Sequence, residues 1–283
     1  MEAELLVGHA IGLDRLGLYL VLDRPLDPKE MDMARDLVSR RAKGEPSAYL
    51  LGYKEFYGRR FDVGPGVLIP RPETELLVDR ARAIAEELEP VKTPTAFVAG
   101  VSDQPAATEE RRITACDIGT GSGCIAITVA LEVPLVRMLA IDICPDALAI
   151  AKANAEVLEV PKTRLGFKCG DGFEVIAGAA PDGVDLLLSN PPYIDSEDRT
   201  HIAADVLKHE PRGALFSPQG DPDYWARLLM ERRARLLTPR GRGLVELGFD
   251  QAPRLEKLAR DHGVDFQIHA DLNGIPRLLE FGR

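Results

Sequence analysis

The chain has 283 residues, of which 45% are hydrophobic and 28% are charged, as in ordinary soluble globular proteins. Its 45 Asp and Glu residues outnumber its 35 Lys and Arg residues, so the net charge is −10 at pH 7. Proteins that grip duplex nucleic acid usually present a basic face, so this balance argues mildly against a nucleic-acid substrate. A local basic cluster remains compatible with it, and five arginines lie close together at 232, 233, 235, 240 and 242.

The N-terminal stretch and the cysteines indicate a cytoplasmic protein. Acidic residues follow Met1 where a signal peptide needs positive charge, and no early apolar run is long enough to span a bilayer. The four cysteines form no C-x-x-C pair, so we expect buried, reduced thiols and neither disulfides nor a metal site. They are Cys116, Cys124, Cys144 and Cys169.

Residues 1–50 predict a set of short helices. Asp27 can cap a helix that has Pro28 at its first position, and apolar residues such as Met31, Ala34 and Leu37 follow at helical spacing. This helix should end near residue 44, where a glycine precedes Glu45-Pro46.

Residues 53–69 change to a period of two, which predicts a hairpin that connects the helical part to the rest of the chain. We assign the turn of this hairpin to Gly64-Pro65-Gly66. A helix with an apolar face should follow Pro70–Glu75. Prolines and small polar residues over 90–112 predict an exposed loop or insertion, and we expect no catalytic role for it.

The second half alternates strands with helices, which predicts a mostly parallel, doubly wound α/β sheet. Strands are expected at 113–118, 136–141, 165–169, 184–189 and 243–247, and helices at 126–132, 145–158 and 224–237. The segments 264–269 and 277–281 should form a hairpin-like pair that closes the sheet.

Polar residues or glycines follow four consecutive strands of this predicted sheet. A glycine loop, Gly119-Thr120-Gly121-Ser122-Gly123, follows the first strand and would let a ligand approach the backbone closely. It lacks the third glycine of the dinucleotide fingerprint, because Cys124 stands there. Asp142 ends the second strand, where an acid can bind ribose hydroxyls, and Asp171 follows the third. This set of residues predicts a site for a nucleoside ligand but no binding site for a pyrophosphate group. S-adenosylmethionine is a ligand of that kind.

The fourth strand is followed by Asn190-Pro191-Pro192-Tyr193. Neither proline has an N–H to donate, and both have φ fixed, so the turn is rigid and rich in acceptors. The side-chain carbonyl of Asn190 and the main-chain carbonyl of Pro191 can together accept both hydrogens of a planar NH2 group. Tyr193 would supply a flat face beside that group, or else pack beneath the loop.

These motifs together resemble the HemK family of protein-(glutamine-N5) methyltransferases, which modify peptide chain release factors. The resemblance runs from about residue 41 to the C-terminus. The box at 190–193 is shared with amino-directed nucleic-acid methyltransferases, but its combination with the segment at 68–75 is much more specific. The signatures are Gly44-Glu45-Pro46, Leu68-Ile69-Pro70-Arg71-Pro72-Glu73-Thr74-Glu75, Asp117 to Gly123, Ser189 to Ile194, Glu210-Pro211 and Glu246-Leu247-Gly248.

The resemblance implies a helical recognition domain over residues 1–50, a hairpin linker over 51–70 and a Rossmann-like, seven-stranded methyltransferase domain over 71–283. The implied cofactor is S-adenosylmethionine, and the implied partner is a release factor rather than a membrane or nucleic acid.

In this family the glycine loop from Gly119 to Gly123 would bind the methionine and ribose parts of the cofactor. Asp142 would hold the ribose, and Asp171-Gly172 would lie beside the adenine. Family members often carry Trp at the position of Gly172, so this chain departs from the pattern there. Asn190, which also borders the cofactor, Pro191, Pro192 and Tyr193 would hold the glutamine side chain, with catalytic roles for Asn190, Pro191 and Tyr193.

Three other functions fit parts of the pattern. The box at 190–193 fits any planar NH2 group, so adenine N6 or guanine N2 of a nucleic acid is one alternative substrate. A glutamine of a ribosomal protein is a second and would need the same chemistry. A nucleoside-binding scaffold without activity is a third. The arginines at 232–242 could contact an acidic partner or RNA, although a solvated helix face is expected.

Overall fold

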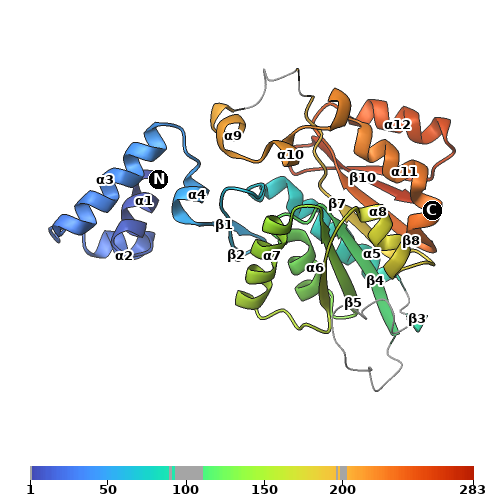
Figure 1. The fold of residues 1–283 in the computed structure, drawn as a ribbon, viewed down its shortest axis with the longest axis horizontal. Coiled ribbons are helices and arrows are strands. Elements are labelled where there is room, and N and C mark those ends of the chain that lie inside the picture. The colour runs from blue at the N-terminus through green and yellow to red at the C-terminus, as the bar shows by residue number, and fades with distance from the viewer. Residues whose placement is uncertain (1, 89–90, 93–110, 196, 198–202) are drawn as a thin grey trace.

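The computed structural model describes residues 2–88, 91–92, 111–195, 197 and 203–283. Four helices open the chain and form a lobe that projects from the sheet-containing part (Figure 1). They are α1 (Glu2–Ala10), α2 (Arg15–Leu20), α3 (Pro28–Ala42) and α4 (Ser47–Leu51). The predicted start of α3 is confirmed, because Asp27 and Glu30 form a complete capping box around Pro28. Domain boundaries at residues 50 and 70 stay a prediction.

The hairpin after this lobe is confirmed, but its predicted turn is wrong. Strand β1 (Tyr53–Phe56) pairs with β2 (Arg59–Asp62) through a two-residue turn at Tyr57 and Gly58. Both turn residues have positive φ, 52° and 69°, which matches the twist of the strands that they join. Gly64-Pro65-Gly66 lies beyond β2, in the segment that leads to a 3-10 turn, η1 (Pro72–Thr74), and α5 (Glu75–Glu87).

The remaining elements alternate and build the predicted sheet. Its strands are β3 (Val91–Lys92), β4 (Arg111–Ile118), β5 (Val136–Asp142), β6 (Leu165–Cys169), β7 (Val184–Ser189), β8 (Leu237–Glu246), β9 (Phe266–Ala270) and β10 (Pro276–Gly282). Between them lie α6 (Cys124–Glu132), α7 (Pro145–Val157), α8 (Gly172–Ala179), α9 (Ala204–His209), α10 (Arg212–Leu215), the 3-10 turn η3 (Pro218–Gly220), α11 (Tyr224–Leu236) and α12 (Ala252–Asp261). Most of the loop predicted over 90–112 lies outside the described residues.

The strand order is β6-β5-β4-β7-β8-β10-β9, and the short β3 pairs with β4. The first five strands in this order are parallel, and β10 and β9 complete the sheet as antiparallel strands. This arrangement confirms the predicted mostly parallel seven-stranded sheet with a closing pair. Every residue of β7 is buried, as expected for a central strand covered on both faces.

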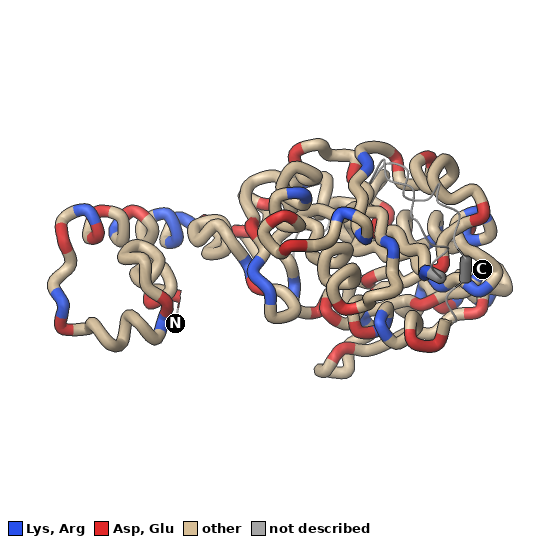
Figure 2. Tube along the Cα trace, turned by 90° about the horizontal axis from the view of Figure 1, so that it is seen from below, with Lys and Arg blue, Asp and Glu red and all other residues tan. Residues whose placement is uncertain are grey.

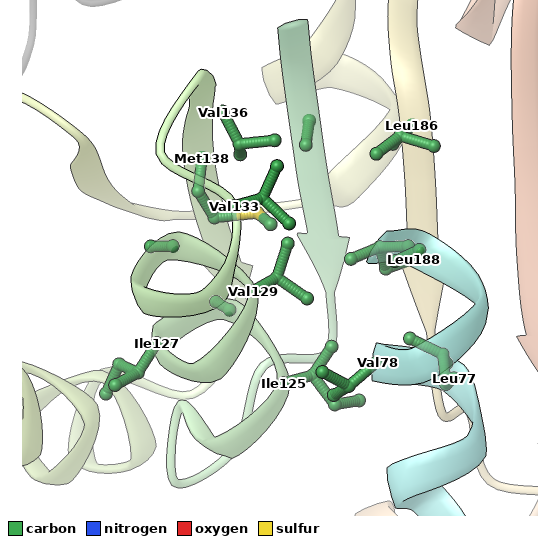
Figure 3. Packing of buried hydrophobic residues seen from close by; sticks show 14 of the residues in the cluster. Leu77, Val78, Ile125, Ile127, Val129, Val133, Val136, Met138, Leu186 and Leu188 are labelled. Atoms are coloured by element: carbon green, nitrogen blue, oxygen red, sulfur yellow. The ribbon is translucent and has the colours of Figure 1, made fainter. Parts of the chain in front are cut away.

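Two hydrophobic clusters cover the two faces of the sheet. On one face, the apolar side chains of α5 and α6 pack in one cluster with those of β4, β5 and β7. Figure 3 labels members of this cluster from α5, α6, β5 and β7. On the other face lie Ile176 of α8, Leu229 of α11 and Leu255 of α12, all buried. The clusters fix the strands from both sides, so the positions of the loops at the strand ends are set by the sheet.

The cysteine prediction holds in part. All four thiols are free, and Cys116 and Cys124 are buried. Cys144 is only partly buried and Cys169 is exposed. Cys144 lies just beyond β5, and Cys169 is the last residue of the edge strand β6, so neither lies in the core. Among the described residues, no helix is long and apolar enough to cross a membrane, and no cluster of His, Cys, Asp or Glu has the composition of a metal site.

Candidate active site

The register of the parallel strands brings the predicted site residues together at the carboxyl-terminal ends of these strands. Ile118 of β4 is paired with Ile141 of β5 and with Ser189 of β7. The residues that follow these three positions are Gly119, Asp142 and Asn190, so they leave the sheet side by side. The Ser189 hydroxyl also donates to the Ile118 carbonyl at 2.8 Å. This hydrogen bond connects the last residue of β7 to the last residue of β4. The convergence predicted from the sequence is therefore present in the fold.

The glycine loop has the shape of a ligand cradle. Gly119, Gly121 and Gly123 have φ values of 75°, 55° and 82°, a region that favours glycine. A Cβ atom added at Gly119 or Gly121 would meet no atom within 4 Å, so these two glycines face open space. At Gly123, by contrast, an added Cβ would approach Ile127 and Ala151, and the loop turns there into α6. Between them, Thr120 and Ser122 are buried.

Asp142 holds this loop in place. Its Oδ2 accepts the Gly121 N–H at 2.9 Å, and its Oδ1 accepts the Cys144 N–H at 2.9 Å. A carboxylate has about four lone-pair sites, so two remain for the hydroxyls of a ligand. Below the loop, Asp117 is fully buried and accepts from the Thr120 hydroxyl at 2.7 Å. Burial raises the pKa of Asp117 to about 7.

Asp171 and Gly172 follow β6 and lie at the start of α8. Oδ1 of Asp171 caps this helix by accepting the N–H groups of Phe173 and Glu174. An added Cβ at Gly172 would come within 2.8 Å of the Ile118 side chain, so Ile118 fills the space beside it. The neighbouring ring of Phe173 is partly buried and lies under the guanidinium of Arg232 at 4.3 Å.

The segment from Asn190 to Tyr193 is fixed by contacts on both sides. Nδ2 of Asn190 donates to Oγ1 of Thr74 at 3.2 Å, so its Oδ1 points the other way. Pro191 is buried, and the Tyr193 ring lies against Gly248, where an added Cβ would come within 3.1 Å of it. Burial raises the pKa of Tyr193, so its phenol stays neutral. Next along the chain, Ile194 forms a bridge to Phe216.

Two residues at this edge were not predicted as part of the site. Thr74 ends η1 and is 2% exposed, and Glu246 ends β8 and is 5% exposed. Ser189 pairs with Val245, so Glu246 is the β8 counterpart of Asn190. Burial raises the pKa of Glu246 to about 7, and its buried Oε2 accepts no hydrogen bond from the residues that the structure describes. Both residues stand in the signature stretches of the sequence, but only the fold brings them together with Asn190.

A groove of about 580 Å³ lies beside the site, between the helical lobe and the sheet-containing part. Its lining comes from α1, α3, α4, the hairpin, the segment 69–73 and α9. The wall at Arg71 is held by a 2.6 Å ion pair with Glu210, whose side chain is 1% exposed and which also accepts the Ile69 N–H. Arg41 of α3 lies 3.9 Å from Asp205 of α9, so the two parts also contact each other directly.

This sheet order, with an open glycine loop after β4 and an acid as the last residue of β5, defines an S-adenosylmethionine-dependent methyltransferase of the Rossmann-like class. Family models described as "PrmC N-terminal domain" and "Methyltransferase small domain" match residues 1–52 and 104–219. The chain belongs to the family of release factor glutamine methyltransferases, because full-length members of that family are more than 30% identical to it along nearly all of its length.

Two of these relatives illustrate the likeness. The release factor glutamine methyltransferase of Chlorobaculum tepidum is 37% identical over 282 residues, which cover 99% of this chain and 88% of that protein. The one from Bordetella pertussis is 38% identical over 280 residues, covering 98% and 93%. Among solved structures, the N-terminal domain of human METTL16 shares the fold, with 15% identity and a TM-score of 0.52 over 88% of this chain and 82% of that one.

Proposed function

We propose that this chain transfers a methyl group from S-adenosylmethionine to the side-chain amide nitrogen of a glutamine in a peptide chain release factor. The observation that carries the proposal is the orientation of Asn190 beside the glycine loop. Its Nδ2 is engaged by Thr74, which leaves Oδ1 as an acceptor at the edge of the sheet. Relatives that match nearly the whole chain are named release factor glutamine methyltransferases, and methylation of a glutamine amide is the chemistry that this acceptor supports.

The residues present fit the cofactor. The open space at Gly119 and Gly121 would accept its methionine and ribose parts, and the free lone pairs of Asp142 would accept its ribose hydroxyls. Asp171 and Gly172 would lie beside its adenine. When bound, S-adenosylmethionine supplies an electrophilic methyl group on a positively charged sulfur.

The box at 190–193 would activate the amide by holding it. An amide nitrogen is a weak nucleophile, because its lone pair is delocalised into the carbonyl. Oδ1 of Asn190 and the main-chain carbonyl of Pro191 accept its two N–H bonds, while Pro192 and Tyr193 confine the rest of the side chain. Methyl transfer would form an N–C bond, break the S–C bond of the cofactor to leave S-adenosylhomocysteine, and release one N–H proton to solvent. Positive charge would develop on the nitrogen as it reacts, and fixed carbonyl dipoles would stabilise that state more than the neutral amide.

The groove beside the site suggests how a protein substrate is recognised. Its lining includes residues of the helical lobe as well as the segment 69–73, which leads into the site. We assign recognition of the release factor to residues 1–50 and chemistry to the rest. A nucleic-acid substrate fits less well, because acidic and basic segments are interspersed over both parts (Figure 2). In the arginine cluster, Arg240 binds Asp185 and Arg242 lies 3.7 Å from Glu280.

The test of this function offers labelled S-adenosylmethionine with three acceptors in parallel. They are a release factor, the same factor with the target glutamine substituted, and nucleic acid. Label should appear only on the unsubstituted release factor. Label on nucleic acid, or label that survives the glutamine substitution, would overturn the proposal.

The assignment of the box has its own test in Asn190→Ala. This change removes one of the two fixed acceptors, and we expect turnover to fall by about 10²–10³. Steady-state kinetics at saturating substrate measures it, and binding of S-adenosylhomocysteine by calorimetry checks that the cofactor site is intact. Near-normal turnover in this variant would show that the box does not hold the amide.

A further inference from the structure

Asn154 of α7 is a buried amide that lies outside the site described above. It is 1% exposed, and its side chain is hydrogen-bonded to two other segments of the chain. Its Oδ1 accepts the Asp62 N–H at 2.8 Å, and its Nδ2 donates to the Asp62 carbonyl at 3.0 Å. Nδ2 also donates to the Ser122 carbonyl at 2.9 Å. One side chain therefore joins the last residue of β2 to the glycine loop.

This set of hydrogen bonds requires a carboxamide. The backbone of Asp62 offers one N–H and one carbonyl, and Ser122 offers a second carbonyl, so the side chain must accept once and donate twice. An aspartate could accept from the N–H, but it would place its negative oxygens against both carbonyls. A leucine of similar size could make none of these bonds. The backbone groups of two segments, 92 and 32 residues away, thus determine which side chain fits at position 154.

On the cofactor side, the bond to Ser122 completes the support of the glycine loop. Asp142 holds the loop through the Gly121 N–H, and Asn154 holds the next residue through its carbonyl. Ser122 is 2% exposed, whereas Gly121 faces open space. The two bonds therefore fix the part of the loop against which a ligand would lie, and the position of Asn154 sets the shape of that part.

On the other side, Asp62 belongs to the hairpin that connects the helical lobe to the sheet. Asp62 is paired with Tyr53 of β1, and the Val63 N–H donates to the Gly52 carbonyl at 3.0 Å. Tyr53 lines the groove beside the site. Figure 1 shows β1 and β2 between α4 of the lobe and α7. The contacts from the glycine loop to this wall of the groove therefore run through two residues, Asn154 and Asp62.

We infer that Asn154 is a positioning residue that couples the glycine loop to the hairpin, so that cofactor and protein substrate favour each other's binding. When a bound cofactor orders the loop, the Ser122 carbonyl is fixed, and Asn154 then fixes the backbone of Asp62 at the wall of the groove. Coupling between two sites is reciprocal, so a substrate held in the groove orders the loop to the same extent. The coupling to a release factor rests on the proposed function, whereas the coupling of loop and hairpin does not.

The attachment of the hairpin does not depend on Asn154 alone. Val63 packs in a buried cluster with Ala147 of α7, and Arg59 of β2 forms an ion pair with Glu132 of α6. Neither contact involves a residue of the glycine loop. A variant at position 154 should therefore keep the fold and lose the link between the loop and the hairpin.

The first experiment follows hydrogen exchange of the Asp62 amide by NMR in the full chain, with and without S-adenosylhomocysteine. This amide is bonded to Asn154, so its exchange in the wild type should slow about fivefold or more when the ligand binds. In Asn154→Leu at saturating ligand, the rate should change by less than about twofold. Unchanged exchange in the wild type would overturn the inference, whether or not any variant folds.

Asn154→Leu and Asn154→Asp separate hydrogen bonding from packing, because both keep the branched shape of asparagine and nearly its volume. Affinity for S-adenosylhomocysteine should fall about tenfold in Asn154→Leu, which loses one hydrogen bond to the loop. It should fall further in Asn154→Asp, which places a carboxylate against the Ser122 carbonyl. Calorimetry measures both. Wild-type affinity in both variants would mean that the residue only fills space, and the inference would be wrong.

Glu132→Ala is the matched control. It removes a different polar anchor of the hairpin, the ion pair with Arg59, and leaves the bonds of the glycine loop in place. The slowing of exchange at Asp62 on binding of S-adenosylhomocysteine should stay within about twofold of the wild type. Loss of this slowing in Glu132→Ala as well as in Asn154→Leu would assign it to general loosening of the hairpin and would overturn the role of Asn154.

The last measurement is the affinity for a release factor with and without S-adenosylhomocysteine. The ligand should tighten release factor binding about 5–10-fold in the wild type and less than about twofold in Asn154→Leu. Equal binding with and without the ligand, while exchange at Asp62 still responds, would overturn the coupling to the substrate. A release factor that neither binds nor accepts label would remove the proposed function, and exchange at Asp62 would still decide whether loop and hairpin are coupled.

Discussion

At the scale of a single residue, the Asp142 side chain connects the glycine loop to the start of α7. One carboxylate oxygen accepts from Gly121 in the glycine loop and the other accepts from Cys144 at the start of α7. Hydrogen bonds to a charged acceptor are stronger than those to a neutral one, at about 1.5–3 kcal/mol. The loop therefore depends on the charge of this side chain as well as on its shape.

Asp142→Asn should weaken the binding of S-adenosylhomocysteine by about 10–100-fold, because one amide end would then present N–H to a backbone N–H. Isothermal calorimetry on the purified chain measures this directly. Asp146→Asn is the control, since it removes the same charge from an exposed position in the first turn of α7. Equal affinities for the wild type and Asp142→Asn would refute the assigned role.

At the scale of elements, the sequence predicts most of the parallel strands well and the site's polar contacts poorly. Strands β6 and β7 were predicted to the residue. For β7 the reason is its short apolar run, bounded by Gly183 and Asn190, which is too short for a helix. The start of β8 was missed, because Pro239 and Gly241 lie inside it beside a register shift. α8 was missed too, since it is short and carries glycines at its first residue and near its end.

Thr74 and Glu246 show why the rest of the site could not be predicted. Thr74 and Asn190 are 116 residues apart, and no local periodicity relates them. Their contact depends on how η1 packs across the ends of β7 and β8, which is a property of the assembled sheet. The strand-end residues Asp142 and Asn190 could be predicted, because parallel strands place their carboxyl ends at one edge by rule.

β8 also contains a position where the sheet depends on glycine. Gly243 pairs with Phe281 of β10, and an added Cβ would lie 2.3 Å from the phenyl ring. Gly243→Ala should therefore lower the free energy of unfolding by about 1–3 kcal/mol through overpacking. Gly178→Ala in α8 should instead raise it by up to about 1 kcal/mol, because its Cβ would meet nothing within 4 Å. Urea unfolding of both variants checks these opposite signs, and a destabilised Gly178→Ala with a neutral Gly243→Ala would contradict the packing seen in β8.

At the scale of the whole molecule, one buried carboxylate connects elements 200 residues apart. Glu280 of β10 accepts from Arg80 of α5 at 2.6 and 3.2 Å and contacts Nε2 of His269 in β9 at 2.9 Å. Burial raises the pKa of Glu280, but the hydrogen bonds and charges of Arg80 and His269 outweigh it, so the pKa is lowered overall. The helix that follows the linker is thus anchored to the last strand of the chain.

The sign of this pKa shift predicts a dependence of stability on pH. A carboxyl group whose pKa is lower in the folded chain stabilises it above the unfolded pKa, about 4.3 for Glu, and loses this contribution as the pH falls further. Glu280→Gln should therefore lower the free energy of unfolding by about 2 kcal/mol at pH 7. Its difference from the wild type should shrink as the pH falls from about 5 to 3. Glu87→Gln is the control, since Glu87 is exposed and lies 3.8 Å from the same Arg80. Urea titrations across this range decide the matter: a constant difference at every pH would mean that Glu280 acts through its shape and not through its charge.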